Sequence, residues 1–192
     1  MKDKIERRAY SVTELRFDAA EGAAAKMSGH AAMFDSLSQD LGGFREIIAP
    51  GTFSNTIQTS DIRALFNHDS NIVLGRNKAG TLRLKEDSSG LAIEIDPPDT
   101  TAARDLAISM MRGDINQMSF GFRTIRDAWK KVDGEWIRTL LEVDLFDVSP
   151  VTYPAYTETD IAMRSMQDAV KLQIPDDAYV IGLMKRKLDL CL

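Results

Sequence analysis

The chain has 192 residues, enough for one domain with a substantial core but too few to make two full domains the first expectation. Hydrophobic residues make up 44% and charged residues 28% of the chain, and no apolar run approaches the roughly 20 residues that a membrane-spanning helix needs. The formal net charge is −5 with both signs interspersed, so neither a membrane nor DNA or RNA is an expected partner.

Two further features limit the chemistry. Cys191 is the single cysteine, which excludes an internal disulfide and leaves too few ligands for a structural zinc cluster. The N-terminal stretch carries charges without a following apolar segment, so we predict no secretory signal and expect a cytoplasmic protein. Nothing in the sequence indicates a cofactor.

The first third of the chain predicts strands and a long connection. Residues 7–34 mix short apolar runs with a Glu21-Gly22 turn, a pattern that predicts two strands around an alanine-rich bend. Residues 40–58 contain a Gly-Gly pair and a Pro-Gly turn, and end in a helix-like segment from Thr52 to Gln58. We interpret this stretch as an ordered connection.

The next segment predicts a strand that ends in a polar cluster. Apolar residues alternate up to Phe66, and the pattern breaks at Asn67-His68-Asp69, which places His68 at a strand end. Residues 81–86 and 90–96 then alternate on either side of an Asp-Ser-Ser-Gly turn, so they predict a hairpin.

The best helix of the chain follows this hairpin. Asp99 or Thr100 can cap it, and it is expected to run to about Arg112. Ala103, Leu106 and Met110 form its apolar stripe, extended by Ala107 and Met111, and Gly113 ends it.

The segment INQMSFGFRTI, residues 115–125, predicts a strand with two different faces. Met118, Phe120 and Phe122 are expected to face a core, while Ser119 and Gly121 fall on the opposite face. The pair Asp133-Gly134 predicts a tight hairpin between two long strands. Pro150 and Pro154 are expected to end the sheet, and a helix is predicted over residues 159–171.

Together these elements predict six to eight strands and two or three helices. We expect an α+β, mainly β fold, built as a closed or curled antiparallel β-barrel surrounded by helices. Residues 1–160 are expected to form the main domain, and residues 161–192 a helical or mobile tail.

Only two histidines are available for catalysis. His30 lies in a strand-like run without acidic neighbours, which favours a structural role. His68 lies in a polar turn beside Asn67 and Asp69, where an imidazole can keep one nitrogen free.

A set of three residues indicates serine chemistry. A lone strand serine or a lone loop histidine is more often structural, but a serine nucleophile needs a base, and the base needs a third group that fixes its tautomer. Ser119 and His68 supply the first two, and Glu142, Asp144 and Asp147 are candidates for the third. Asp147 lies near the end of its strand, where we expect it to be buried against an imidazole. Asp144 is the alternative third residue.

Four blocks of the sequence also resemble a known family. "GHAAMFDSLSQDLGGFREIIAPGTF", "ALFNHDSNIVLGR", "GLAIEIDPPDTTAARDLAISMMRGDINQMSFGF" and "FDVSPVTYPAY" are similar, in this order, to the HK97-type prohead proteases of tailed bacteriophages. The resemblance implies a herpesvirus-assemblin-like fold and a serine endopeptidase of capsid maturation. It assigns the catalytic triad to His68, Ser119 and Asp147. His30 departs from the family pattern, in which we expect an aromatic or aliphatic residue.

The resemblance also implies partners and a location. The expected substrates are the scaffold protein or the scaffold segment of the major capsid protein, and the protease itself, inside the assembling procapsid in the host cytoplasm. The polar end of the chain is the first place to look for self-cleavage. Assemblin-like enzymes dimerise, so a homodimer is expected, and they place the oxyanion hole after the third triad residue, here within 149–152.

Two other hypotheses remain. A catalytically inactive scaffold or capsid-assembly protein of the same fold would hold Ser119 and His68 apart. A metal-dependent hydrolase would use His68 with Asp61 or Asp69, although the histidine spacing matches no HxH or HExxH motif.

Overall fold

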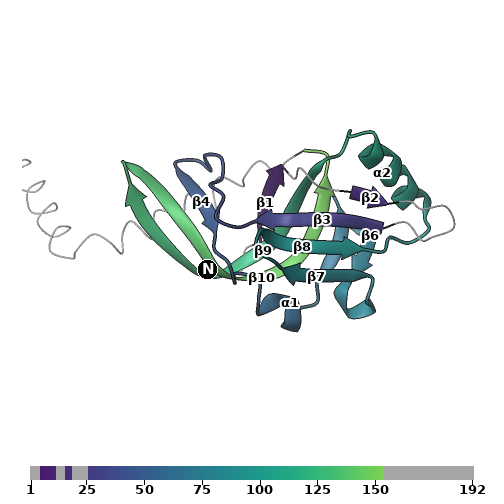
Figure 1. Cartoon of the computed structure of the whole chain (residues 1–192), viewed down its shortest axis with the longest axis horizontal. Coiled ribbons are helices and arrows are strands. Elements are labelled where there is room, and N and C mark those ends of the chain that lie inside the picture. The colour runs from purple at the N-terminus through teal and green to yellow at the C-terminus, as the bar shows by residue number, and fades with distance from the viewer. Residues whose placement is uncertain (1–4, 12–15, 19–25, 154–192) are drawn as a thin grey trace, which may run out of the picture.

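A long two-stranded ribbon organises the structure, a computed structural model that describes residues 5–11, 16–18 and 26–153. Strands β9 (Gln117–Val132) and β10 (Glu135–Val151) are antiparallel neighbours along this ribbon. They are joined at Asp133-Gly134, where both residues have positive φ angles of 49° and 90°, as a tight hairpin turn requires. Figure 1 shows the tip of the ribbon extending away from the rest of the molecule, past β4.

The ribbon is the centre of a six-stranded mixed sheet. The strand order is β1 (Glu6–Ser11), β9, β10, β5 (Arg63–Phe66) and β6 (Asp69–Arg76), and β4 (Phe44–Ile48) also pairs with β10. Strands β4 and β5 are both parallel to β10, beside different parts of its length. Strand β1 is antiparallel to the first six residues of β9.

A second sheet of four antiparallel strands completes the core. Its order is β2 (Arg16–Asp18), β3 (Lys26–Met33), β8 (Gly90–Ile95) and β7 (Leu82–Glu86). Strands β7 and β8 form the predicted hairpin. Buried side chains of both sheets, such as Met27 and Ile93 from one and Phe120 and Phe122 from the other, form one hydrophobic cluster. The two sheets therefore share a single core.

Helix α2 (Thr101–Met111) confirms the predicted helix closely. The Thr100 hydroxyl accepts a hydrogen bond from the backbone N–H of Ala103, and Gly113 follows the helix with a φ of 81°. The predicted apolar stripe is buried except for Met111, which is exposed. Helix α1 (Thr56–Thr59) is shorter and begins later than expected, and η1 (Asn77–Ala79) is one 3₁₀ turn. No helix within the described ranges is long and apolar enough to cross a membrane.

The mainly β fold is confirmed, but the predicted closed barrel is wrong. Among the described residues the strands form two sheets with free ends, and neither closes on itself. The pairing is not purely antiparallel either, because β10 is long enough to accept two parallel partners as well as β9. Register shifts interrupt the β9–β10 pairing between Leu140 and Asp147, the stretch of β10 that separates these two parallel partners. Only α1, α2 and η1 accompany the sheets in this part of the chain, so helices do not surround them.

The strand count and one strand end also differ from the predictions. The described residues contain ten strands, and three of them, β2, β4 and β6, were not expected. Strand β4 alternates buried and half-buried residues, but Glu46 occupies a core-facing position and hides the apolar pattern. Pro150 does not end β10, which continues to Val151, and its carbonyl accepts a hydrogen bond from the backbone of Asn67.

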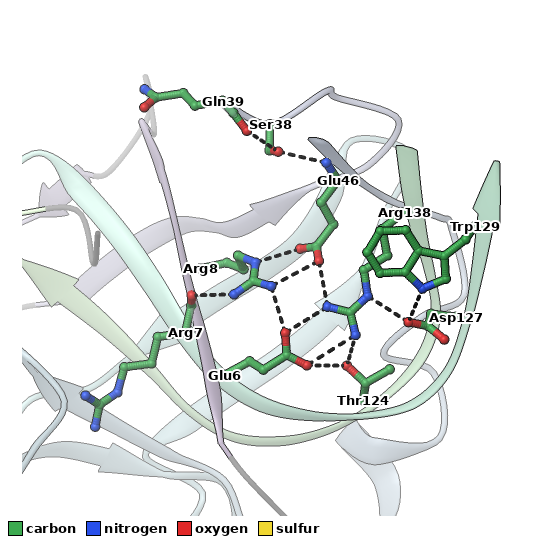
Figure 2. Close-up of polar contacts among 10 residues, drawn as sticks. All are labelled: Glu6, Arg7, Arg8, Ser38, Gln39, Glu46, Thr124, Asp127, Trp129 and Arg138. Carbon is green, nitrogen blue, oxygen red and sulfur yellow. Dashed lines mark hydrogen bonds and ion pairs between the residues drawn. The ribbon is translucent and has the colours of Figure 1, made fainter. Parts of the chain in front are cut away.

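A buried cluster of four charged side chains fixes β1 against the ribbon (Figure 2). Arg8 of β1 pairs with Glu46 of β4 at 2.9 Å and with Glu6 at 2.7 Å. Arg138 of β10 pairs with Glu6 at 2.8 Å and with Glu46 at 3.1 Å. All four side chains are at most 6% exposed. Two positive and two negative charges therefore neutralise one another on the core side of β1.

Several predictions concern residues outside the described ranges. These are the alanine-rich bend, the helix over 159–171, the boundary between residues 160 and 161, and the position of Cys191.

Candidate active site

His68 lies in the two-residue turn between β5 and β6. Asn67 and His68 both have positive φ angles, 53° and 58°, which is the geometry of a type I′ hairpin turn. This conformation is uncommon for a histidine. The side chain of Asn67 stabilises the turn by accepting a hydrogen bond from the N–H of Thr152 at 2.9 Å, and by donating one to the Thr152 hydroxyl at 3.2 Å. The turn that carries His68 is therefore bound to the end of β10.

Ser119 lies near the start of β9, between two neighbouring strands. Met118, Phe120 and Phe122 are fully buried, which confirms the predicted core face. The opposite face is not open to solvent as the alternation indicated, because Ser119 is also 0% exposed. Ala9 of β1 lies directly beside Ser119 on one side, and Ser149 of β10 on the other. The pairing of β9 on both edges holds the serine in a rigid part of the sheet.

The structure brings His68, Ser119 and Asp147 together in one chain of hydrogen bonds. The imidazole Nε2 is 2.7 Å from Ser119 Oγ, and Nδ1 is 2.6 Å from Asp147 Oδ1. The side chains of His68 and Asp147 are only 6% and 12% exposed. An ionised carboxylate can only accept, so Nδ1 carries the hydrogen and Nε2 is free to accept from the serine hydroxyl.

Gly121 leaves the space that the Asp147 carboxylate occupies. The two residues are cross-strand neighbours between β9 and β10. A Cβ atom built on Gly121 would overlap Asp147 Oδ2. The glycine therefore makes room for the acid.

The other acidic candidates have partners elsewhere. Asp144 accepts a hydrogen bond from Ser60 at 2.9 Å and pairs with Arg123 at 2.8 Å. Glu142 accepts from Asn55 at 3.4 Å. Neither contact involves His68, so Asp147 is the carboxylate that the fold places beside the imidazole.

The residues proposed for a metal site form ion pairs or turn contacts instead. Hydrogen bonding from Arg76, together with the positive charge of Arg63, lowers the pKa of Asp61 to about 2 against the cost of its desolvation. Asp69 accepts from the backbone N–H of Asn71 at 2.8 Å. Across the described ranges, no three His, Cys, Asp or Glu side chains gather as metal ligands would. The second histidine, His30, belongs to β3 and pairs with Asp87 at 2.8 Å.

Two of the four residues predicted to supply backbone N–H groups to an oxyanion hole, 149–152, cannot do so. Pro150 has no N–H, and the N–H of Thr152 donates to Asn67. Ser149 and Val151 lie in a part of β10 that pairs with β9, where strand pairing uses backbone N–H groups.

The chain is similar to proteases of tailed bacteriophages in both sequence and fold. The family model described as caudovirus prohead serine protease matches residues 11–172. The chain is 26% identical over 175 residues to the prohead protease of Enterobacteria phage HK97, with 89% of this chain and 73% of that protein covered. The capsid assembly protease gp21 of bacteriophage T4 has a similar fold, with a TM-score of 0.50 over 77% of this chain and 97% of that one. Its sequence is only 8% identical, so this likeness supports the fold alone.

The family match covers most of the chain and includes every residue of the hydrogen-bonded set. The chain belongs to the caudovirus prohead serine protease family.

Proposed function

We propose that this protein is a serine endopeptidase of phage head maturation in which Ser119 is the nucleophile, His68 the general base and Asp147 the group that orients the imidazole. The observation that carries the proposal is the continuous hydrogen-bonded chain of these three side chains. Family membership supports peptidase activity in general, and the contacts support these particular residues. The inactive-scaffold alternative required Ser119 and His68 to lie apart, and the 2.7 Å contact does not favour it.

The geometry suits both halves of peptide hydrolysis. Ser119 Oγ attacks the carbonyl carbon of the scissile bond while its proton moves to His68 Nε2, and Asp147 stabilises the imidazolium that forms. His68 then donates this proton to the leaving nitrogen, which breaks the C–N bond and leaves an ester on Ser119. Water attacks the ester, with His68 again accepting and returning one proton, and releases the second product. A removed oxyanion donor typically costs about 2.7–4 kcal/mol in such enzymes.

The proposed substrates follow from the relatives. One relative is named as a prohead protease and the structural neighbour as a capsid assembly protease. We infer that this protein cleaves the scaffold protein or the scaffold segment of the major capsid protein inside the assembling procapsid. High local concentration there would allow weak substrate affinity to suffice. We also infer that residues 1–160 are the protease domain, that cleavage of the protease itself falls within residues 161–192, and that the enzyme forms a homodimer.

Co-expression with the cognate capsid and scaffold proteins tests the proposal. Intact-mass analysis of every chain is expected to show defined fragments with the wild type and none with Ser119→Ala. Ser88→Ala, in the exposed β7–β8 turn, is the matched control and is expected to give the wild-type fragments. Identical masses for wild type and folded Ser119→Ala would contradict the peptidase assignment and favour the inactive-scaffold hypothesis.

A further inference from the structure

One carboxylate oxygen of Asp147 accepts two hydrogen bonds. His68 Nδ1 lies 2.6 Å from Oδ1, and the hydroxyl of Ser149 donates to the same oxygen at 2.7 Å. Hydrogen bonds to an ionised acceptor are shorter and stronger than those between neutral groups. The hydroxyl of Ser149 therefore acts on the atom that His68 uses.

Ser149 is placed for this contact by the strand itself. It follows Asp147 by two residues on β10, so both side chains project from the same face of the strand. It is also the direct cross-strand neighbour of Ser119 on β9, and it is 0% exposed. A buried hydroxyl needs a partner, and here its partner is the carboxylate beside the nucleophile.

The carboxylate of Asp147 is held from two sides. Ser149 and His68 bond Oδ1, while the backbone of Gly121 leaves just enough room for Oδ2. A carboxylate bonded at one oxygen by one donor can rotate about its Cβ–Cγ bond. A second donor on the same oxygen, with the β9 backbone behind the other oxygen, restricts that rotation.

We propose that Ser149 is a positioning residue of the triad, whose hydroxyl holds the Asp147 carboxylate in the orientation that fixes the His68 tautomer. The inference rests on the proposed function, because it concerns the efficiency of the same Ser119 nucleophile. Ser149 does not touch the reacting atoms, and its effect passes through Asp147.

Loss of the hydroxyl has two expected consequences. A less well oriented imidazole lowers kcat by about tenfold to a hundredfold, the range that one hydrogen bond to a charged group supports, and leaves KM unchanged. The negative charge on Oδ1 is also less neutralised, so it stabilises the imidazolium more strongly. The acidic limb of the pH–rate profile therefore moves to higher pH.

The test compares full-length Ser149→Ala, Ser149→Cys and Ser149→Thr with the wild type. The substrate is a synthetic peptide that spans a bond cleaved in the co-expression experiment, assayed from about pH 5 to about pH 9. Ser149→Ala is expected to show the loss of kcat and the shifted limb. Ser149→Cys, with its weaker donor, is expected to fall between alanine and wild type. Ser149→Thr keeps the hydroxyl and is expected to stay within about threefold of wild type.

The outcomes separate this inference from the proposed function. Wild-type kcat and pH profile for folded Ser149→Ala, with no cleavage by Ser119→Ala, would overturn the role of Ser149 and leave the nucleophile in place. If Ser149→Ala does not fold, a wild-type pH profile for Ser149→Cys would overturn it equally. Cleavage by Ser119→Ala at the wild-type rate would overturn the proposed function, and the role of Ser149 with it.

Discussion

Replacement of Arg138 by methionine tests the buried charge cluster most directly. Arg138 donates to Glu6, Glu46, Asp127 and Thr124, so the substitution removes one of the two cations and several hydrogen bonds together. Glu6 and Glu46 would remain buried with Arg8 as their cation. Breaking a buried ion pair by removal of one partner costs about 3–5 kcal/mol, because a charge is left without compensation.

The pKa of Glu6 gives a second measure of the same interaction. Burial alone would raise the pKa of Glu6, but the hydrogen bond and charge of Arg138, with the charge of Arg8, lower it from 4.5 to about 2. This difference corresponds to about 3 kcal/mol, in the same range as the cost of a broken pair. For a chain of this length a loss of 3–5 kcal/mol lowers Tm by about 10 °C.

Thermal and urea unfolding measure the effect. The matched control is Arg112→Met, because Arg112 pairs with Asp114 at 3.0 Å in an exposed position, with side chains 72% and 55% exposed. This change is expected to cost less than about 1 kcal/mol. Adding Glu46→Gln to Arg138→Met removes the excess negative charge and is expected to restore part of the lost stability. An Arg138→Met protein as stable as Arg112→Met would refute the reasoning.

Three other outcomes are expected. Because the folded pKa of Glu6 is depressed, its contribution to stability is complete above about pH 4.5 and is lost as the pH falls towards 2; Tm measured against pH is expected to fall in that window. Gly121→Ala displaces the Asp147 carboxylate, so we expect kcat in the peptide assay to fall by about a hundredfold or more, and an unchanged kcat would contradict the assigned space. Asn67→Gly keeps the positive φ but removes both side-chain bonds to Thr152; we expect kcat to fall about tenfold with little change in circular dichroism, whereas wild-type kcat would show that these bonds do not position the turn.

The local elements were predictable because each has a strong signal of its own. The Thr100 cap and Gly113 stop delimit α2, and Asp133-Gly134 defines the ribbon turn. The core face of β9 follows from the alternation of Met118 and Phe120 with smaller residues.

The candidate site was predictable as a set of residues, but its surroundings were not. The sequence indicated His68 by its polar cluster and Asp147 by its position near a strand end, and the fold brings both into contact. Their catalytic role stays a proposal. Ser119 lies between β1 and β10; the Asp133-Gly134 turn predicted its pairing with β10, but pairing with the distant β1 leaves no mark in local periodicity. Ser149 carried no signal beyond its place two residues after the acid.

The difference between the predicted and the observed sheet has a physical reason in β4. Glu46 occupies a core position in β4 because Arg8 and Arg138 neutralise it there. A charged residue in an alternating segment is normally read as solvent-facing, so β4 was interpreted as a connection. With β4 unrecognised, the second parallel partner of β10 could not be anticipated, and a simple antiparallel barrel was expected.

The pairing of β1 with β9 imposes an order of events on synthesis. Glu6 and Arg138, which meet in the buried cluster, are 132 residues apart in the chain. At 5–20 residues per second, a ribosome needs about 7–26 seconds to make the intervening chain. For most of that time β1 lacks its strand partner β9, and Glu6 has only Arg8 of its two cationic partners. The surroundings of Ser119 are therefore completed only after β10 has been made, so a nascent chain cannot hold an assembled site while its own C-terminal strands are still being synthesised.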